Sequence, residues 1–311
     1  MSRPIRLLLC TSSSQASTWR DALAAALPEA HVTLWPEIDA SPDYVVAWKP
    51  APELFARVRP TRAIFNLGAG VDALMRLSDM PADVPLVRLE DAGMAAQMIE
   101  YVTLAVLAMQ RQREAYAAQQ RAGIWRGLPR IPAHEFAVGI LGMGVLGQAC
   151  GQALARFGFP LLGWSRTRKH VAGVRTYAGN DGLGEVLAAS RVLVCLLPAT
   201  PDTRGLLDGK RLSQLPKGAH LVNVARGDLV VEEDLLALLD ADHLASATLD
   251  VFAEEPLPAR HPFWHHPKVV LTPHISAVTL PQESAAQVAA KIRQLERGER
   301  ISGVVDRTQG Y

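Results

Sequence analysis

A strand-like run that leads directly into a glycine turn is the strongest constraint in this sequence. Residues 138–141, Val-Gly-Ile-Leu, run into Gly142-Met143-Gly144-Val145-Leu146-Gly147, and residues 148–157 continue with a helical pattern. In such a turn the first glycine permits a sharp bend, the second lets the backbone approach a pyrophosphate, and the third lets the helix pack on the strand. The backbone amides and the helix dipole then point at phosphate. The pattern predicts a dinucleotide site, and its alternative is a tight turn without a ligand.

Short apolar runs alternate with segments of helical period along the whole chain. The expected strands are residues 5–10, 31–34, 44–48, 63–67, 85–89, 136–141, 161–165, 192–197, 220–225, 246–251 and 269–272. Such alternation is typical of parallel sheets with helices on their faces. The length of 311 residues exceeds what one hydrophobic core usually serves. We therefore expect an α/β chain with two doubly wound parallel-sheet domains.

The position of the glycine turn places the dinucleotide-binding domain in the middle of the chain. Residues 95–121 contain no proline and one apolar face, which predicts a single long helix that crosses between the domains. Residues 281–297 again have a helical pattern and are expected to return to the first domain. The expected division is a substrate domain at 1–100, a dinucleotide-binding domain at 101–280 and a C-terminal return at 281–311. This arrangement is a Rossmann domain inserted into a flavodoxin-like domain.

Composition excludes several function classes. The 32 basic and 31 acidic residues give a net charge of +1, which offers no extended field for nucleic acid or an acidic membrane surface. The three cysteines, Cys10, Cys150 and Cys195, lie in apolar runs without metal-ligand or disulfide spacing. The apolar stretch at the N-terminus is too short for a signal peptide. These features predict buried, reduced thiols and a cytoplasmic protein.

A basic segment follows the next expected strand, about 20 residues after the last glycine of the turn, where NAD enzymes usually carry a carboxylate for the ribose hydroxyls. Here the chain has Ser165-Arg166-Thr167-Arg168-Lys169. Ser165 can donate a hydrogen bond to a 2′-phosphate, and Arg166 and Arg168 can add charge-assisted ones. This predicts a preference for NADPH, with NADH possible. The alternative is a solvated basic loop and similar use of both cofactors.

Three further passages carry a family resemblance. They are residues 65–72 (FNLGAGVD), residues 221–227 (LVNVARG), and residues 250–256 (DVFAEEP) together with 272–274 (TPH). These passages resemble the signatures of D-isomer-specific 2-hydroxyacid dehydrogenases, and the resemblance covers nearly the whole chain. It implies reduction of small 2-oxo acids such as glyoxylate and hydroxypyruvate, and pairing of two subunits through their cofactor domains.

The resemblance also implies three catalytic residues. His274 would donate a proton to the substrate carbonyl oxygen. Glu255 would accept a hydrogen bond from the other ring nitrogen, fix the ring and favour its protonated form. Arg226 would bind the substrate carboxylate and stabilise the developing alkoxide. Taken singly, each residue type at a strand end is usually a surface ion pair or a hydrogen-bonded histidine.

By the same resemblance, the substrate carboxylate would also meet the backbone amides of Ala69 and Gly70, so the substrate would lie between the two domains. Asp250 would meet the nicotinamide carboxamide. Other cofactor contacts are expected at Leu197, Pro198 and Ala225. Trp48 and Trp264 would wall a small substrate pocket, although simple packing explains a tryptophan in either place equally well.

Two alternatives remain open at this level. His261, His265 and His266 suggest a metal site, but two prolines break any helical face and no carboxylate or cysteine pattern accompanies them, so a polar surface loop is expected and no metal. The rival functions are a dehydrogenase of a bulkier D-2-hydroxy acid and a dinucleotide-sensing corepressor, because fold alone does not decide function.

Overall fold

The computed structural model describes residues 3–11, 14–38 and 41–310, so the ends of the expected terminal segments, residues 1–2 and 311, lie outside the described residues. The chain divides into two compact units. Unit 1 comprises Met1–Met94 and Thr279–Tyr311, and unit 2 comprises Ala95–Val278. The expected boundaries, after residues 100 and 280, fall a few residues later. Within the described part of the chain, no helix has the length and apolar content needed to cross a membrane.

Unit 1 is built on a parallel five-stranded sheet in the order β2-β1-β3-β4-β5. Its elements are β1 (Ile5–Thr11), α1 (Ala16–Ala26), β2 (Ala30–Leu34), β3 (Tyr44–Trp48), α2 (Leu54–Arg57), β4 (Ala63–Asn66), α3 (Asp72–Met75), β5 (Leu86–Arg88) and α10 (Pro281–Glu296). This order is that of a flavodoxin-like fold. Trp19, Leu23 and Leu27 of the α1 region lie four residues apart and are buried, so this apolar stripe faces the core.

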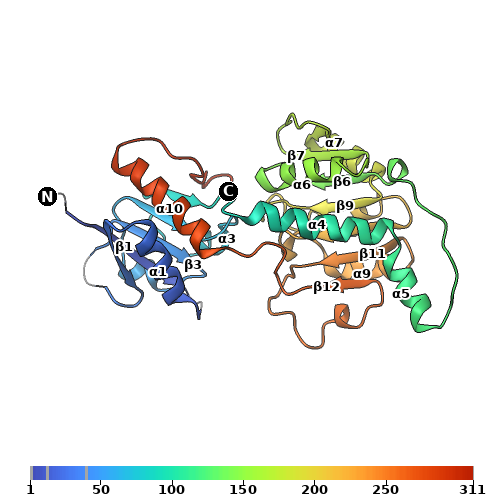
Figure 1. Cartoon of the computed structure of the whole chain (residues 1–311), viewed down its shortest axis with the longest axis horizontal. Coiled ribbons are helices and arrows are strands. Elements are labelled where there is room, and N and C mark those ends of the chain that lie inside the picture. The colour runs from blue at the N-terminus through green and yellow to red at the C-terminus, as the bar shows by residue number, and fades with distance from the viewer. Residues whose placement is uncertain (1–2, 12–13, 39–40, 311) are drawn as a thin grey trace. The chain divides into compact units, whose positions relative to one another are not determined.

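The C-terminal segment completes unit 1. Helix α10 packs on α1, and the chain after it reaches the edge strand β5 (Figure 1). There the amide of Arg88 donates to the carbonyl of Gly303, and the amide of Val305 donates to the carbonyl of Leu86. Unit 1 is therefore discontinuous in sequence, with unit 2 inserted between β5 and α10.

Unit 2 is built on a parallel seven-stranded sheet in the order β12-β11-β10-β9-β6-β7-β8. Its elements are α4 (Met94–Gln110), α5 (Arg113–Arg121), β6 (Val138–Leu141), α6 (Val145–Ala155), β7 (Leu161–Ser165), β8 (Arg175–Ala178), α7 (Gly179–Ala189), β9 (Val192–Cys195), α8 (Gly209–Leu212), β10 (Ala219–Asn223), α9 (Glu232–Asp240), β11 (Leu244–Leu249) and β12 (Val269–Leu271). The strand order reverses between β6 and β9, which is the point where doubly wound sheets bind dinucleotides.

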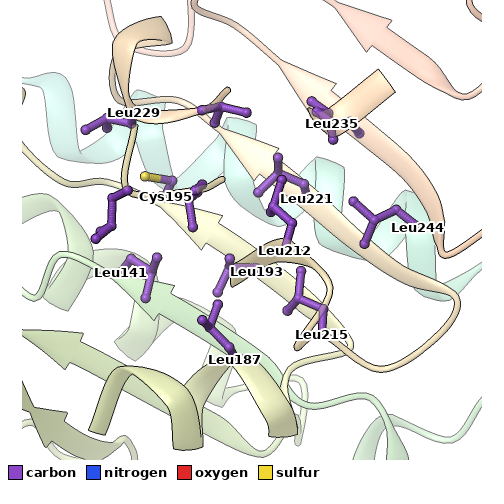
Figure 2. Close-up of a cluster of buried hydrophobic side chains, with 14 of the residues drawn as sticks. Leu141, Leu187, Leu193, Cys195, Leu212, Leu215, Leu221, Leu229, Leu235 and Leu244 are labelled. Atoms are coloured by element: carbon purple, nitrogen blue, oxygen red, sulfur yellow. The ribbon is translucent and has the colours of Figure 1, made fainter. Parts of the chain in front are cut away.

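The core of unit 2 lies on both faces of this sheet. Along β9, Val192 and Val194 join one apolar cluster with α4 and α6, whereas Leu193 and Cys195 join the other with α7 and α9. Figure 2 shows part of the second cluster, with leucines from several neighbouring strands lying close together. Successive side chains of a strand point to opposite faces, so a strand covered on both sides must be apolar throughout. This explains the uninterrupted apolar runs in the sequence.

One expectation about the elements is wrong, and one strand is missing from the expected set. The helix expected over residues 95–121 is two helices, α4 and α5, because Gln112 adopts a left-handed conformation with φ of +55° and breaks the helical path. The two compact units divide at the beginning of α4. Strand β8 was not expected, because its short, partly exposed sequence RTYA has no long apolar run.

The three cysteines are buried, as the sequence predicts. Burial raises the pKa of Cys10 and raises the pKa of Cys150 and of Cys195 to about 12. All three are therefore protonated thiols of low reactivity at neutral pH.

Candidate active site

The strands of unit 2 end in one row at their carboxyl edge. In sheet order the residues in register are Tyr177, Trp164, Leu141, Cys195, Asn223, Leu249 and Leu271. The candidate cofactor and catalytic residues of unit 2 come from the ends of six different strands and all follow this row by a few positions. A parallel sheet places such residues along one edge, where doubly wound folds bind their ligands.

The glycine turn after β6 fits a dinucleotide. Gly142 has φ of +102°, and a Cβ there would lie 2.5 Å from the carbonyl oxygen of Leu196. A Cβ on Gly147 would lie 1.8 Å from the carbonyl oxygen of Gly142. By contrast, a Cβ on Gly144 would have no protein atom within 4 Å. The protein's own packing therefore explains the first and third glycines, whereas the second leaves open space at the beginning of α6, where a phosphate would lie.

The other residues of the turn contribute in different ways. Met143 is 1% exposed and its side chain packs on Gly163, so this residue fastens the turn to the core. Val145 is exposed and Leu146 is partly buried. Gln148 anchors the turn by donating from Nε2 to the carbonyl of Met143 at 3.0 Å. The side chains of Met143 and Gln148 thus hold the turn, and Gly144 and Val145 are its exposed residues.

The basic segment begins at the end of β7, the strand next to β6. Arg166 and Arg168 are exposed. The hydroxyl of Ser165 donates to the carbonyl oxygen of Thr167 at 2.8 Å. Donation from Ser165 to a 2′-phosphate therefore requires its hydroxyl to rotate away from Thr167.

Leu197, Pro198 and Ala225 follow the ends of β9 and β10. Leu197 and Ala225 are each 7% exposed, so both residues are largely buried. The carbonyl of Pro198 accepts a hydrogen bond from the hydroxyl of Thr203 at 2.6 Å, which fixes the loop. Leu197 and Pro198 follow β9, which borders the strand-order reversal, and Ala225 follows the next strand, β10.

His274 and Glu255 form a direct pair. Nδ1 of His274 lies 2.8 Å from Oε2 of Glu255, and the two side chains are 36% and 28% exposed. An ionised carboxylate only accepts hydrogen bonds, so Nδ1 carries the proton. The other carboxylate oxygen of Glu255 accepts from the amide of Phe252 at 3.2 Å. The pair is oriented by its loop and still reaches solvent.

Arg226 follows β10, and its turn is held by a buried asparagine. Nδ2 of Asn223 donates to the carbonyl of Arg226 at 2.9 Å, and Nη1 of Arg226 donates to the carbonyl of Ala225 at 2.7 Å. A Cβ on Gly227 would lie 1.8 Å from the backbone carbon of Phe252. The turn of Arg226 therefore packs directly on the loop that carries Glu255, which is why position 227 is glycine.

Asp250 is fully buried at the end of β11. Its Oδ1 accepts from the hydroxyl of Thr272 at 2.6 Å and from the amide of Ile275 at 2.8 Å, and its Oδ2 accepts from the amide of Ser276 at 2.8 Å. The side chain thus holds the loop on both sides of His274.

In unit 1 the turn after β4 is also held by a buried asparagine. Nδ2 of Asn66 donates to the carbonyls of Gly68 and Gly70 at 2.9 and 2.8 Å. Because the carbonyl and the next amide of a peptide point in opposite directions, the amide of Ala69 points away from Asn66. A Cβ on Gly68 would clash with the ring of Trp48 at 2.4 Å. Trp48 therefore has a packing role in this turn.

The remaining aromatic and histidine candidates lie in the loop between β11 and β12. Trp264 is 46% exposed and donates from Nε1 to the carbonyl of Pro258 at 3.0 Å. His265 is exposed. His261 is not a solvated loop residue, because it pairs with Glu232 at 3.2 Å and packs on the ring of Phe263. The loop is exposed at most of its positions, and His266 likewise pairs, with Asp240 at 3.2 Å.

Comparison with known proteins gives the family. The family model of the D-isomer specific 2-hydroxyacid dehydrogenase NAD binding domain matches residues 103–276. The chain is 45% identical to glyoxylate/hydroxypyruvate reductase A of Yersinia enterocolitica over 303 residues, which cover 96% of this chain and 97% of that protein. The chain belongs to the D-isomer specific 2-hydroxyacid dehydrogenase family.

Solved structures of similar dehydrogenases agree with this membership. A D-isomer specific 2-hydroxyacid dehydrogenase from Xanthobacter autotrophicus Py2, in complex with NADPH and MES, has a TM-score of 0.95 at 40% identity, with 99% of this chain and 100% of that chain covered. An NADPH-dependent glyoxylate/hydroxypyruvate reductase from Sinorhizobium meliloti, in complex with NADP and sulfate, has a TM-score of 0.93 at 37% identity over 99% and 100% of the two chains. The expected fold class is confirmed.

The structure of this dehydrogenase adds site residues that sequence reasoning missed. They are Asn66, Asn223 and Thr272, which hold the turns that carry Ala69, Arg226 and His274. Each lies at or just beyond a strand end and immediately before a candidate site residue or its turn. A polar residue ending a buried strand is the signal that would have found the two asparagines, because a buried amide must find partners in the adjoining turn.

Proposed function

We propose that this chain is an NADPH-dependent reductase of small 2-oxo acids, with glyoxylate and hydroxypyruvate as substrates. The observation that carries the proposal is the His274–Glu255 pair, 2.8 Å apart, at the same sheet edge as the glycine turn. The names of the similar proteins, glyoxylate/hydroxypyruvate reductase A and NADPH-dependent glyoxylate/hydroxypyruvate reductase, support the choice of substrates.

Each catalytic side chain has a task that its surroundings favour. A bound nicotinamide cofactor supplies the hydride that reduces the carbonyl carbon. His274, with Nδ1 donating to Glu255, gives the proton on Nε2 to the carbonyl oxygen. Arg226 binds the substrate carboxylate with its planar guanidinium and stabilises the negative charge that grows on the carbonyl oxygen. The product is the 2-hydroxy acid, and the imidazole regains its proton from solvent.

The cofactor is proposed to bind along the edge of unit 2. The glycine turn would hold the pyrophosphate, with Gly144 leaving the space that a side chain would fill. Ser165, Arg166 and Arg168 would bind a 2′-phosphate and give the preference for NADPH. Leu197, Pro198 and Ala225 would border the bound dinucleotide, and Asp250 would meet the nicotinamide carboxamide.

The substrate is proposed to meet backbone amides of unit 1. Asn66 draws the carbonyls of Gly68 and Gly70 toward itself, which supports an outward amide at Ala69. Ala69 and Gly70 would donate to the substrate carboxylate. Trp48 and Trp264 are proposed to limit substrate size, with Trp48 acting through the turn it packs on.

Steady-state kinetics test the function. NADPH oxidation is followed at saturating cofactor with glyoxylate, hydroxypyruvate, pyruvate and phenylpyruvate. The proposal expects higher kcat/KM for the first two than for phenylpyruvate. A reversed order would indicate a dehydrogenase of bulkier acids, and NADPH binding without oxidation of cofactor by any 2-oxo acid would indicate a dinucleotide sensor.

We further propose a homodimer formed through unit 2. Helices α4 and α6 line an apolar groove that includes Leu104 and Phe157, which are 70% and 44% exposed. Trp125, on the segment after α5, is fully exposed, and Figure 1 shows this segment on the outside of unit 2. Exposed apolar surface of this kind is typical of subunit interfaces. Light scattering should give twice the monomer mass, and Leu104→Glu should shift it toward the monomer.

A further inference from the structure

His274 has an unusual backbone conformation. Its φ is +57°, a left-handed conformation that residues with a Cβ rarely adopt. Such a conformation persists only where the surrounding structure fixes it. The amide of His274 donates to the carbonyls of Asp250 and Thr272 at 2.9 and 3.1 Å. The proposed proton donor is therefore displayed by a loop that must be held in place.

The buried carboxylate of Asp250 is the centre of this support. It accepts hydrogen bonds from Thr272 on one side of His274 and from Ile275 and Ser276 on the other. A displacement of any of these three groups would change the backbone direction at His274. The backbone conformation of His274 thus depends on the groups that hold the carboxylate of Asp250 and its hydrogen-bond partners in place.

Tyr101 of α4 extends this support. Its hydroxyl lies 2.6 Å from Oγ1 of Thr272. Because an ionised carboxylate only accepts, the Thr272 hydroxyl gives its hydrogen to Asp250, and Tyr101 must then be the donor to Thr272. Burial, with a smaller contribution from the charge of Asp250, raises the pKa of the Tyr101 phenol, which keeps this donor protonated. The hydrogen bonds run in one direction, from Tyr101 through Thr272 to Asp250.

A second residue of α4 holds the other end of the same loop. Nε2 of Gln97 donates to the carbonyl of Val278 at 3.0 Å, and Oε1 of Gln97 accepts from the amide of Val278 at 3.2 Å. Gln97 and Tyr101 lie four residues apart and so share one face of the helix. One face of α4 therefore contacts both ends of the segment 272–278 that carries His274.

We propose that Tyr101 is a positioning residue which, through Thr272 and Asp250, fixes the direction in which His274 presents its ring to Glu255 and to the substrate. This inference rests on the proposed function for the role of His274. It assigns to Tyr101 no contact with substrate or cofactor.

Kinetics of conservative variants test the proposal. Tyr101→Phe removes only the hydroxyl and should lower kcat on glyoxylate about tenfold, because small misplacements of a catalytic group are costly. Thr272→Val should lower kcat at least as much, and Thr272→Ser should recover most of it. The NADPH dissociation constant should stay within about twofold in all three. Tyr44→Phe is the matched control, because this buried phenol in unit 1 also donates at 2.6 Å, to Glu296.

A double-mutant cycle checks that the residues act in one chain. If Tyr101 works through Thr272, Tyr101→Phe should have little further effect on kcat in the Thr272→Val background. Independent losses that multiply in the double variant would contradict the proposal. So would a Tyr101→Phe enzyme whose kcat is within twofold of wild type.

Nuclear magnetic resonance gives a readout that does not need turnover. In protein with nitrogen-15-labelled histidine, the Nδ1 proton of His274, assigned by its loss in His274→Gln, should shift or broaden in Tyr101→Phe and stay unchanged in Tyr44→Phe. An unchanged resonance in Tyr101→Phe overturns the positioning role. If wild-type protein reduces no 2-oxo acid, the proposed function fails, and this resonance alone then decides whether Tyr101 positions His274.

Discussion

Oε2 of Glu255 lies 2.8 Å from Nδ1 of His274, although the two residues belong to loops after different strands, β11 and β12. The contact assigns the Nδ1 proton to the shared hydrogen bond and leaves Nε2 as the nitrogen that can serve a substrate. His274→Ala should therefore lower kcat about 10²-fold to 10⁴-fold while NADPH affinity changes little. Full turnover in this variant would reject His274 as the proton donor.

Glu255→Gln tests the carboxylate of the pair. Glutamine keeps the shape and one acceptor but replaces the charge-assisted hydrogen bond to Nδ1 of His274 with a weaker neutral one, so kcat should fall about tenfold or more. Glu254→Gln, next to it on the exposed surface, is the control and should leave kcat unchanged. Stopped-flow and steady-state assays with glyoxylate measure both variants. Equal rates for Glu255→Gln and wild type would argue against the role of the charge.

Arg226→Lys should not restore what arginine provides. Lysine keeps the positive charge but loses the planar fork that binds a carboxylate and a carbonyl oxygen together. We expect kcat/KM on glyoxylate to fall about 10²-fold, with an increase in KM. A lysine variant with wild-type KM would show that Arg226 does not bind the substrate.

The glycine turn predicts different outcomes at two glycines. Gly144→Ala puts a methyl group into open space, so the free energy of unfolding should stay unchanged. The same methyl group would occupy the space proposed for the pyrophosphate, so the NADPH dissociation constant should rise about tenfold or more. Gly147→Ala meets a carbonyl oxygen at 1.8 Å and should destabilise the protein itself. Gly184→Ala, in α7, is the control for a harmless methyl group. Urea unfolding and fluorescence titration measure the two effects, and tight NADPH binding by Gly144→Ala would contradict the site.

Arg166 and Arg168 should set the cofactor preference. Each charge-assisted hydrogen bond to a 2′-phosphate contributes about 1.5–3 kcal/mol, so replacing both arginines with alanine should lower the ratio of kcat/KM for NADPH to that for NADH about 10²-fold. Arg175→Ala is the control. Arg175 is the first residue of β8 and its guanidinium lies over the ring of Tyr177, so its replacement should leave the ratio unchanged. An unchanged ratio in the double variant would remove the 2′-phosphate hypothesis.

His220 gives a pH dependence of stability. Burial, assisted by the charge of Arg191, lowers its pKa from 6.5 to about 4. The unfolded chain therefore binds this proton more readily, so the contribution of His220 to stability is full above pH about 6.5 and is lost as pH falls toward 4. Between pH 7 and pH 5 this loss is about 2 kcal/mol, and His220→Gln should abolish it. His265→Gln, at an exposed position, should leave the pH dependence of the free energy of unfolding unchanged. If His220→Gln kept the wild-type dependence on pH, another group would be responsible.

Much of the fold could be predicted from the sequence because its signals are local. The apolar run before Gly142, the glycine spacing and the helical pattern after Gly147 each depend on neighbours in the chain, and together they predict a strand, a turn and a helix. Continuous apolar strands such as Val192–Cys195 predict a sheet covered on both faces, as the two clusters of unit 2 confirm. The end of α4 at Gln110 and the separate helix α5 could not be predicted, because they depend on the left-handed conformation of Gln112.

The amino-acid sequence by itself determined the candidate residues and the edge of the sheet on which they lie. Only the tertiary structure decided which of them meet. The contact of Glu255 with His274, the packing of Gly227 on Phe252 and the hydrogen bonds from Tyr101 through Thr272 to Asp250 join segments far apart in the sequence. Hydrogen bonds and close packing act over a few ångströms, so such contacts are fixed by how strands and helices pack and leave no local pattern in the chain.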